Sequence, residues 1–297
     1  MRVGPPAVRI REVGPRDGLQ AEAPLGVPDR IRLIAALAAA GLREIEAVAF
    51  VSPAVVPAMA GAAEVLAGLD RGSGVVYVAL VPNLKGAELA LEAGAEALDV
   101  TMSASPEYNG RNIGQTIEQS LRGLRSIRAA AGDLPVDATI SCSFGSPYEG
   151  DIEPAAVASL AAQAVEAGAT SLTFADTTGM ATPRRVEELV AAVGPRVRLH
   201  FHETRGTGLV NAYTALHLGV RDFDTSIGGL GGSPFAAGAA GNLATEALVH
   251  LLDDEGLASG VSLDRLLEAA ALAQSLIGHA LPSPVAAAGP RSRLAPA

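Results

Sequence analysis

Two histidines spaced two residues apart, His200 and His202, carry the clearest chemical signature in this chain, which has 5 histidines in all. Alternate residues of a β-strand face the same side of a sheet, so both imidazoles would point to one place. Imidazole is a common metal ligand, and the pair could therefore hold one cation. Simple packing within a half-buried strand explains the same spacing, so the pattern alone leaves both interpretations open.

A second group of reactive side chains follows the first predicted strand, in the segment EVGPRDGLQ. Asp17 could bind a hard cation, and the neighbouring Arg16 could stabilise an oxyanion. Gln20 could hydrogen-bond the same substrate. A surface Arg–Asp turn between Pro15 and Gly18 is the alternative interpretation.

Two further carboxylates belong to predicted strands. Glu46 lies in the apolar run 43–50, where burial of an unpaired carboxylate is costly. We therefore expect Glu46 to form a salt bridge with Arg16, which is compatible with a role in catalysis. Asp176 stands at the end of the predicted strand 170–175, in the sequence FADTTG.

A glycine-rich segment, residues 228–242, follows the last predicted strand. Such a loop can cradle phosphate on its backbone N–H groups, but no Lys-Ser/Thr pair follows it as in a nucleotide P-loop. We expect a mobile lid. Asn242 at its end could give an amide oxygen to a metal or cap the following helix, and both roles stay open.

A repeated strand and helix unit could bring these residues together. Apolar helical runs close at glycine, and each is followed by a β-rich run. Predicted strands lie near 8–13, 43–50, 75–81, 96–102, 136–143, 170–175, 197–202 and 222–227. Predicted helices follow near 28–40, 55–70, 83–93, 114–131, 154–167, 182–193, 207–218 and 240–253.

Eight even units in about 250 residues indicate an α/β protein, a (β/α)8 TIM barrel. A doubly wound open sheet is the structural alternative. A further helix near 262–279 extends the barrel at its C-terminal end. We expect one domain over residues 1–280 and a flexible tail over 281–297.

The active site of such a barrel lies at the carboxyl ends of its strands. There Asp17, His200, His202 and Asn242 would form a mixed oxygen and nitrogen set with open positions. This set suits a divalent cation. With Arg16 nearby, it would serve cleavage or formation of a C–C bond next to a carbonyl group.

Composition excludes several classes of protein. The net charge of −10 and the absence of Trp argue against nucleic-acid binding. No apolar run is long enough to span a membrane, and no export signal opens the chain. The single cysteine, Cys142, excludes an internal disulfide framework. We therefore expect a cytoplasmic protein.

Several long motifs in order point to one family. The segments EVGPRDGLQ, IEAVAFVSPAVVPAM, SPYEGDI, FADTTG, HFHETRGTGLVNA and GGLGGSPFAAGAAGNLATE are collinear from about residue 8 to 255. Together they resemble the 3-hydroxy-3-methylglutaryl-CoA (HMG-CoA) lyase family. The resemblance implies a metal-dependent TIM-barrel lyase that cleaves HMG-CoA, an acyl-CoA, to acetyl-CoA and acetoacetate, usually as a homodimer.

The resemblance also implies roles for individual residues. The positions that match the family's Mg²⁺ or Mn²⁺ ligands are Asp17, His200, His202 and Asn242. The positions that match its catalytic groups are Arg16, Asp17, Gln20, Glu46, Asp176 and His200. Ser233 completes the catalytic set, because it stands where the lid of the family carries a catalytic cysteine.

The change from cysteine to Ser233 has a chemical consequence. A hydroxyl is far less acidic than a thiol, whose pKa is about 8.5, so serine is a poorer proton donor to a departing enolate. We expect Cys142, in the fifth strand, to be a buried small hydrophobe and not a substitute thiol.

Three hypotheses follow. The first is a divalent-metal lyase acting on HMG-CoA or a related 3-hydroxyacyl-CoA. The second is a Schiff-base aldolase, for which Lys85 is the single candidate amine. The third is a metal-binding relative that has lost turnover, and a condensing direction stays open. We expect a homodimer or a higher homo-oligomer.

Overall fold

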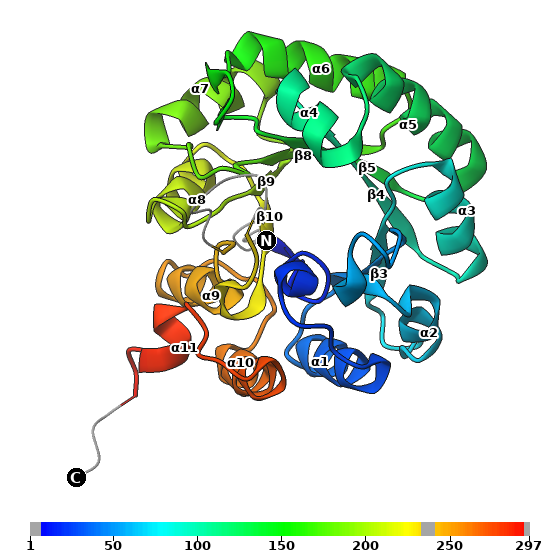
Figure 1. Ribbon diagram of the computed structural model, residues 1–297. Coiled ribbons are helices and arrows are strands. Elements are labelled where there is room, and N and C mark those ends of the chain that lie inside the picture. Colours follow the sequence, from blue (N-terminus) through cyan, green and yellow to red (C-terminus); the bar gives the residue numbers. More distant parts are fainter. Residues whose placement is uncertain (1–6, 233–240, 294–297) are drawn as a thin grey trace, which may run out of the picture.

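Parallel strands close into a barrel, and the helices surround it (Figure 1). The computed structural model describes residues 7–232 and 241–293. Within these ranges eight strands are hydrogen-bonded in the closed order β1-β10-β9-β8-β5-β4-β3-β2. Their bounds are β1 (Arg9–Glu12), β2 (Glu44–Ala49), β3 (Val76–Leu80), β4 (Ala97–Ser103), β5 (Val136–Ser141), β8 (Ser171–Ala175), β9 (Arg198–His200) and β10 (Asp222–Thr225). The predicted TIM barrel is confirmed, and the open sheet is wrong.

The helices alternate with the strands as the sequence indicates. Those of the barrel are α1 (Val27–Ala39), α2 (Ala62–Ala67), α3 (Leu84–Glu92), α5 (Ile117–Ala131), α6 (Pro154–Glu166), α7 (Pro183–Val193), α8 (Gly208–His217) and α9 (Thr245–Asp254). The predicted additional C-terminal helix is α10 (Leu263–Ile277), which packs beside α1. A short helix, α11 (Pro284–Ala288), lies within the segment expected to be a tail. The domain boundary at residue 280 stays a prediction.

Two predicted helices differ from the observed ones for local reasons. The helix expected near 55–70 is reduced to a 3-10 turn, η2 (Pro57–Met59), and the short α2, because Gly61 adopts a left-handed conformation with φ 73° between them. The helix expected from 114 starts after Thr116, whose side chain caps α5 together with Gln119. A helix that the sequence analysis missed, α4 (Pro106–Ile113), precedes it and is capped by Ser105.

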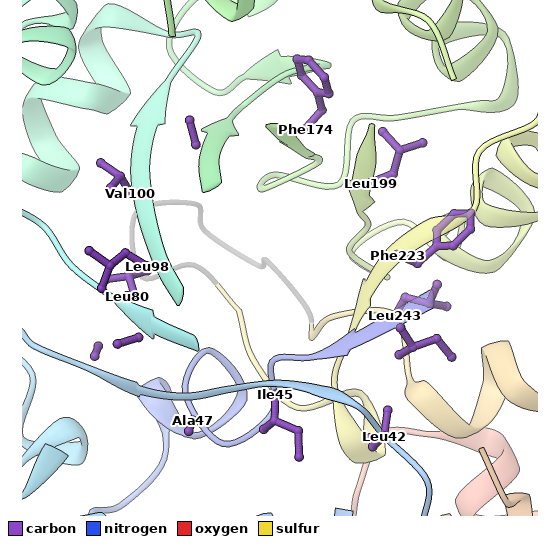
Figure 2. Close-up of a cluster of buried hydrophobic side chains, with 14 of the residues drawn as sticks. Leu42, Ile45, Ala47, Leu80, Leu98, Val100, Phe174, Leu199, Phe223 and Leu243 are labelled. Carbon is purple, nitrogen blue, oxygen red and sulfur yellow. The ribbon is translucent and has the colours of Figure 1, made fainter. Parts of the chain in front are cut away.

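The two faces of the barrel strands differ in chemistry. Figure 2 shows the apolar side chains on the outer side of the strands, toward the helices, among them Ile45, Leu98, Phe174 and Phe223. Alternate residues point into the barrel, and many of these are charged, as in β1, β4, β5 and β10. Branched apolar residues fill the interior of most such barrels. Here charged side chains lie inside instead, and because burial of an unpaired charge is costly, they must form ion pairs with one another.

Three smaller features complete the described part of the chain. A hairpin of β6 (Gly145–Ser146) and β7 (Gly150–Asp151) lies between β5 and α6. Two 3-10 turns, η1 (Gly18–Ala21) and η3 (Ile227–Gly229), follow β1 and β10. Among the described helices, none has the length and apolar character needed to cross a membrane.

Candidate functional site

A cavity of about 350 Å³ opens at the carboxyl ends of the strands, where the sequence analysis placed the active site. Of the predicted site residues, those lining it are Arg16, Asp17, Gln20, His200 and His202. They come from the segment after β1 and from the end of β9 with the residues that follow it, which are nearly two hundred positions apart in sequence. Closure of the barrel brings them together, because β10 pairs with both β1 and β9.

Four side chains converge at one side of this cavity. The ligand atoms of Asp17, His200 and His202 all lie within 4.8 Å of one another. The two imidazole Nε2 atoms are 3.1 Å apart, and Oδ1 of Asn242 lies 2.9 Å from Nε2 of His200. The amide nitrogen of Asn242 donates to Oδ2 of Asp17 at 2.7 Å. We call this group, Asp17, His200, His202 and Asn242, the convergent cluster.

Two backbone segments position the histidines and the asparagine. The strand predicted near 197–202 ends earlier, because β9 stops at His200. His202 instead forms an isolated antiparallel bridge with Asn242, and the N–H of Leu243 donates to the carbonyl of Phe201. The N-cap of α9 is Ala244. Asn242 therefore does not cap this helix, and its side chain faces the histidines.

The donor set of the convergent cluster fits a divalent cation. It offers two imidazole nitrogens, a carboxylate and an amide oxygen, a combination that Mn²⁺ accepts and that leaves positions for substrate or water. Burial alone would raise the pKa of Asp17, but Arg16 and the two histidines outweigh it and the pKa lies below its usual value. Asp17 is consequently ionised at neutral pH, as a ligand must be.

Arg16 sits beside the cluster in the turn after β1. Its Nη1 donates to Oδ1 of Asp17 at 2.8 Å, and its Nε donates to Oε2 of Glu46 at 2.7 Å. The predicted Arg16–Glu46 salt bridge is thus confirmed. Glu46 is fully buried, and burial raises its pKa to about 8 despite the guanidinium. The two carboxylates fix the plane of Arg16 at the cavity wall.

Asp176 lies at the end of β8, between the cavity-lining residues Ala175 and Thr177. Its Oδ1 accepts hydrogen bonds from the N–H groups of Met180 and Ala181, while its buried Oδ2 has no partner within the described residues. Burial raises the pKa of Asp176 to about 7. The side chain therefore holds the following turn and can change protonation near neutral pH.

Ser233, predicted to be catalytic, lies outside the described residues. Gly232, which precedes it, lines the cavity. Cys142 is fully buried in the structure, and burial raises the pKa of its thiol to about 12. The expectation that Cys142 is a buried hydrophobe is confirmed.

The sequence analysis missed a layer of charged residues beneath the cavity. Asp99 and Asp224 line its floor, and Arg11 pairs with Asp224 at 2.7 Å. The pKa of Asp224 lies well below its usual range, because Arg11, His200 and Arg198 together outweigh the effect of burial. Each of these residues is a charged side chain within a predicted strand, and the cost of burying an unpaired charge, which was used for Glu46, would have pointed to them.

A buried carboxylate also braces the start of the glycine-rich segment. Glu12, at the end of β1, accepts hydrogen bonds from the N–H groups of Gly14 and Ile227 and from the hydroxyl of Thr245. It is completely buried, and burial raises its pKa from 4.5 to about 7. Glu12 therefore ties η3 and the first turn of α9 to the first strand.

The raised pKa makes Glu12 a source of pH-dependent stability. Its contribution is present below about pH 4.5 and is lost as the pH rises through about 7, where the folded protein must give up the proton. A shift of this size corresponds to about 3 kcal/mol. In the Glu12→Gln variant, the glutamine keeps an acceptor oxygen and donates to Thr245 but carries no titratable proton. As the pH rises from about 4.5 to about 7, the free energy of unfolding of this variant should therefore fall less than that of the wild type.

Denaturant unfolding between pH 4.5 and 8 measures this effect, with Glu166→Gln on the exposed side of α6 as the matched control. A difference between wild type and Glu12→Gln that does not change with pH would contradict the prediction.

Comparison with known proteins gives consistent results. The model of the family described as HMGL-like matches residues 7–273. The 3-hydroxy-3-isohexenylglutaryl-CoA/hydroxy-methylglutaryl-CoA lyase of Pseudomonas aeruginosa is 45% identical over 273 residues, which are 89% of this chain and 91% of that protein. The hydroxymethylglutaryl-CoA lyase YngG of Bacillus subtilis is 42% identical over 287 residues, with 94% and 96% covered.

The structural similarity is equally extensive. An HMG-CoA lyase from Acinetobacter baumannii, solved in complex with coenzyme A and 3-methylmalate, superposes with a TM-score of 0.93. It is 40% identical in sequence, and the match covers 98% of each chain.

Proposed function

The chain belongs to the HMGL-like family and is a carbon–carbon lyase, and from this premise we propose that it cleaves HMG-CoA to acetyl-CoA and acetoacetate with a divalent cation, Mg²⁺ or Mn²⁺. One observation carries the proposal. The convergent cluster lies in the wall of a cavity beside a buried, oriented arginine. Binding of coenzyme A by a structural neighbour supports an acyl-CoA substrate.

The convergent cluster would hold the cation through Asp17, His200, His202 and Asn242. When bound, the cation would supply Lewis-acid polarisation of the substrate's hydroxyl and carbonyl oxygens. The cavity beside the cluster, about 350 Å³ in volume, gives room for the acyl group.

The residues of the chain then account for the movement of protons and electrons. Asp17, ionised and at the cavity wall, takes the proton of the tertiary hydroxyl as that carbon becomes the ketone of acetoacetate. The electron pair of the broken C–C bond passes to the thioester, which becomes an enolate. The guanidinium of Arg16 stabilises the enolate oxygen. Ser233 returns a proton to the enolate carbon and yields acetyl-CoA.

Other site residues orient these groups. Glu46 holds Arg16 in place, and Gln20 offers an amide to the substrate at the cavity wall. Asp176, with a pKa of about 7, fixes the turn after β8 and suits proton exchange at neutral pH.

A broader substrate range is supported by the apolar part of the cavity lining. Its side chains include Val51, Val56, Leu80 and Ile113. Such a lining would stabilise an apolar substituent larger than methyl at C3. The name of the Pseudomonas relative includes a substrate of this kind, with an isohexenyl group. We therefore propose that 3-alkyl homologues of HMG-CoA are also cleaved.

A panel of 3-hydroxyacyl-CoAs assayed for acetyl-CoA release with added Mg²⁺ tests the proposed function. HMG-CoA and a 3-isohexenyl homologue are both expected to be cleaved. Ser233→Cys should raise kcat, because a thiol donates its proton more readily, whereas Ser233→Ala should lower it by at least about tenfold. Without release from wild type or Ser233→Cys on any substrate, the lyase assignment would be wrong.

The Schiff-base hypothesis is not supported by the position of its lysine. Lys85 lies in the first turn of α3, outside the cavity, with 74% of its side chain exposed and Glu88 at 3.6 Å. The expected homodimer or higher homo-oligomer and the cytoplasmic location stay predictions. So does the flexible character of residues 281–297.

A further inference from the structure

Beneath the convergent cluster, the carboxylate of Asp224 faces the second nitrogen of a histidine. Its Oδ2 lies 3.2 Å from Nδ1 of His200. The two residues are partners in the register of β10 and β9, so both point into the barrel at the same level. Their side chains are only 2% and 9% exposed. Water therefore competes little for this contact.

Arg11 fixes the carboxylate in that position. Its Nε donates to Oδ1 of Asp224 at 2.8 Å, and its Nη2 donates to Oδ2 at 2.7 Å. The same guanidinium reaches Asp137 on β5 at 3.0 Å and the hydroxyl of Thr173 on β8 at 3.3 Å. A planar, bidentate pair held from several strands has little freedom to rotate.

The chemistry of the contact sets the direction of the hydrogen bond at Nδ1 of His200. An ionised carboxylate only accepts hydrogen bonds, so Nδ1 must be the donor toward Asp224. On the other side of the ring, Nε2 faces Nε2 of His202 and the amide oxygen of Asn242, two atoms that can bind a cation. Carboxylates that accept from a ligand histidine in this way fix its orientation and increase its basicity.

We propose that Asp224, held by Arg11, is a positioning residue that fixes the ring orientation of His200 for cation binding through the contact at Nδ1. The inference rests on the proposed function, because it assigns the cation to the convergent cluster. It adds a role for two residues outside the convergent cluster.

Asp224→Asn tests the proposal. The amide replaces one acceptor oxygen by a donor, which opposes a donor of Arg11 or of His200 in either orientation. Mn²⁺ affinity, measured by calorimetry, is expected to fall by about 10- to 100-fold. The increase in Tm on adding Mn²⁺ should shrink in parallel, while the circular dichroism of the metal-free variant stays that of the wild type.

Asp222→Asn is the matched control. Asp222 lies two residues earlier on β10 and also pairs with an arginine, Arg9, at 2.5 Å, but it does not contact His200. Its Mn²⁺ affinity should equal that of the wild type. Equal affinity in a folded Asp224→Asn variant would overturn the proposal.

A measurement on the wild type tests the proposal even if the Asp224→Asn variant does not fold. In Mg²⁺-loaded wild type with ¹⁵N-labelled histidine, His200 should carry its proton on Nδ1, the nitrogen that faces Asp224. A proton on Nε2 would overturn the proposal. If the wild type itself binds no Mn²⁺, the proposed cation-dependent function fails and this inference with it. If the wild type binds Mn²⁺ and a folded Asp224→Asn variant binds it equally well, this inference alone fails.

Discussion

His202→Ala is expected to abolish cation binding and to lower kcat/KM by about a thousandfold or more. His202 offers one of two imidazole nitrogens to the convergent cluster, and alanine leaves that side of the site without a ligand. Lewis-acid stabilisation of a transition state is worth several kcal/mol, and each 1.4 kcal/mol or so is a factor of ten in rate. Mn²⁺ calorimetry and acetyl-CoA release measure the two effects separately.

Chelation gives the same result without a mutation. EDTA should remove the activity of the wild type, and Mg²⁺ or Mn²⁺ should restore it, but neither ion should restore His202→Ala. His217→Ala on the outer side of α8, where the histidine ring lies against Tyr213, is the matched control and should behave as wild type. Full activity in chelator-treated wild type would contradict the cation-dependent mechanism.

Arg16→Met is expected to lower kcat/KM by about 10²- to 10³-fold while Mn²⁺ binding persists. Loss of a group that stabilises a developing oxyanion has an effect of this size. Methionine also leaves Glu46 buried without its counter-charge, so the pKa of Glu46 should rise further. Arg16→Lys keeps the charge but cannot reach both Glu46 and Asp17 with one planar group, so it should recover only part of the activity.

A double variant tests whether Glu46 acts through the arginine. If Glu46 only positions Arg16, Arg16→Met combined with Glu46→Gln should be no slower than Arg16→Met alone. Arg32→Met, which removes an exposed ion pair with Asp29 on α1, is the matched control and should keep full activity. An Arg16→Met variant with wild-type kcat/KM would show that this guanidinium does not stabilise the enolate.

Local sequence patterns predicted most of the framework. The alternation of apolar residues fixes the strands and their outer faces, because burial against the helices depends on a period of two. The predicted helices were wrong where proline and glycine interrupt an apolar pattern that by itself indicates a helix. Pro57 and Gly61 interrupt the helix expected near 55–70, although most of that segment is apolar.

The site was predicted only in part. His200, His202 and Asp17 could be chosen because their residue types and positions at strand ends are chemically unusual. Asn242 could not be assigned, since an asparagine before a helix equally suits a cap. The isolated bridge between His202 and Asn242 joins residues 40 positions apart, and it places Asn242 beside the histidines and not at the cap of the helix.

The sequence by itself determined the barrel, the end of the barrel where the candidate site lies and the reactive residue types found there. Those features depend on local periodicity and on the order of short segments. Only the tertiary structure decided how the charges pair, as in Arg11 with Asp224, which are 213 positions apart. Such pairs form when the first and last strands meet, and no local pattern specifies which inward-facing charge will lie opposite another. The position of His200 depends on that closure.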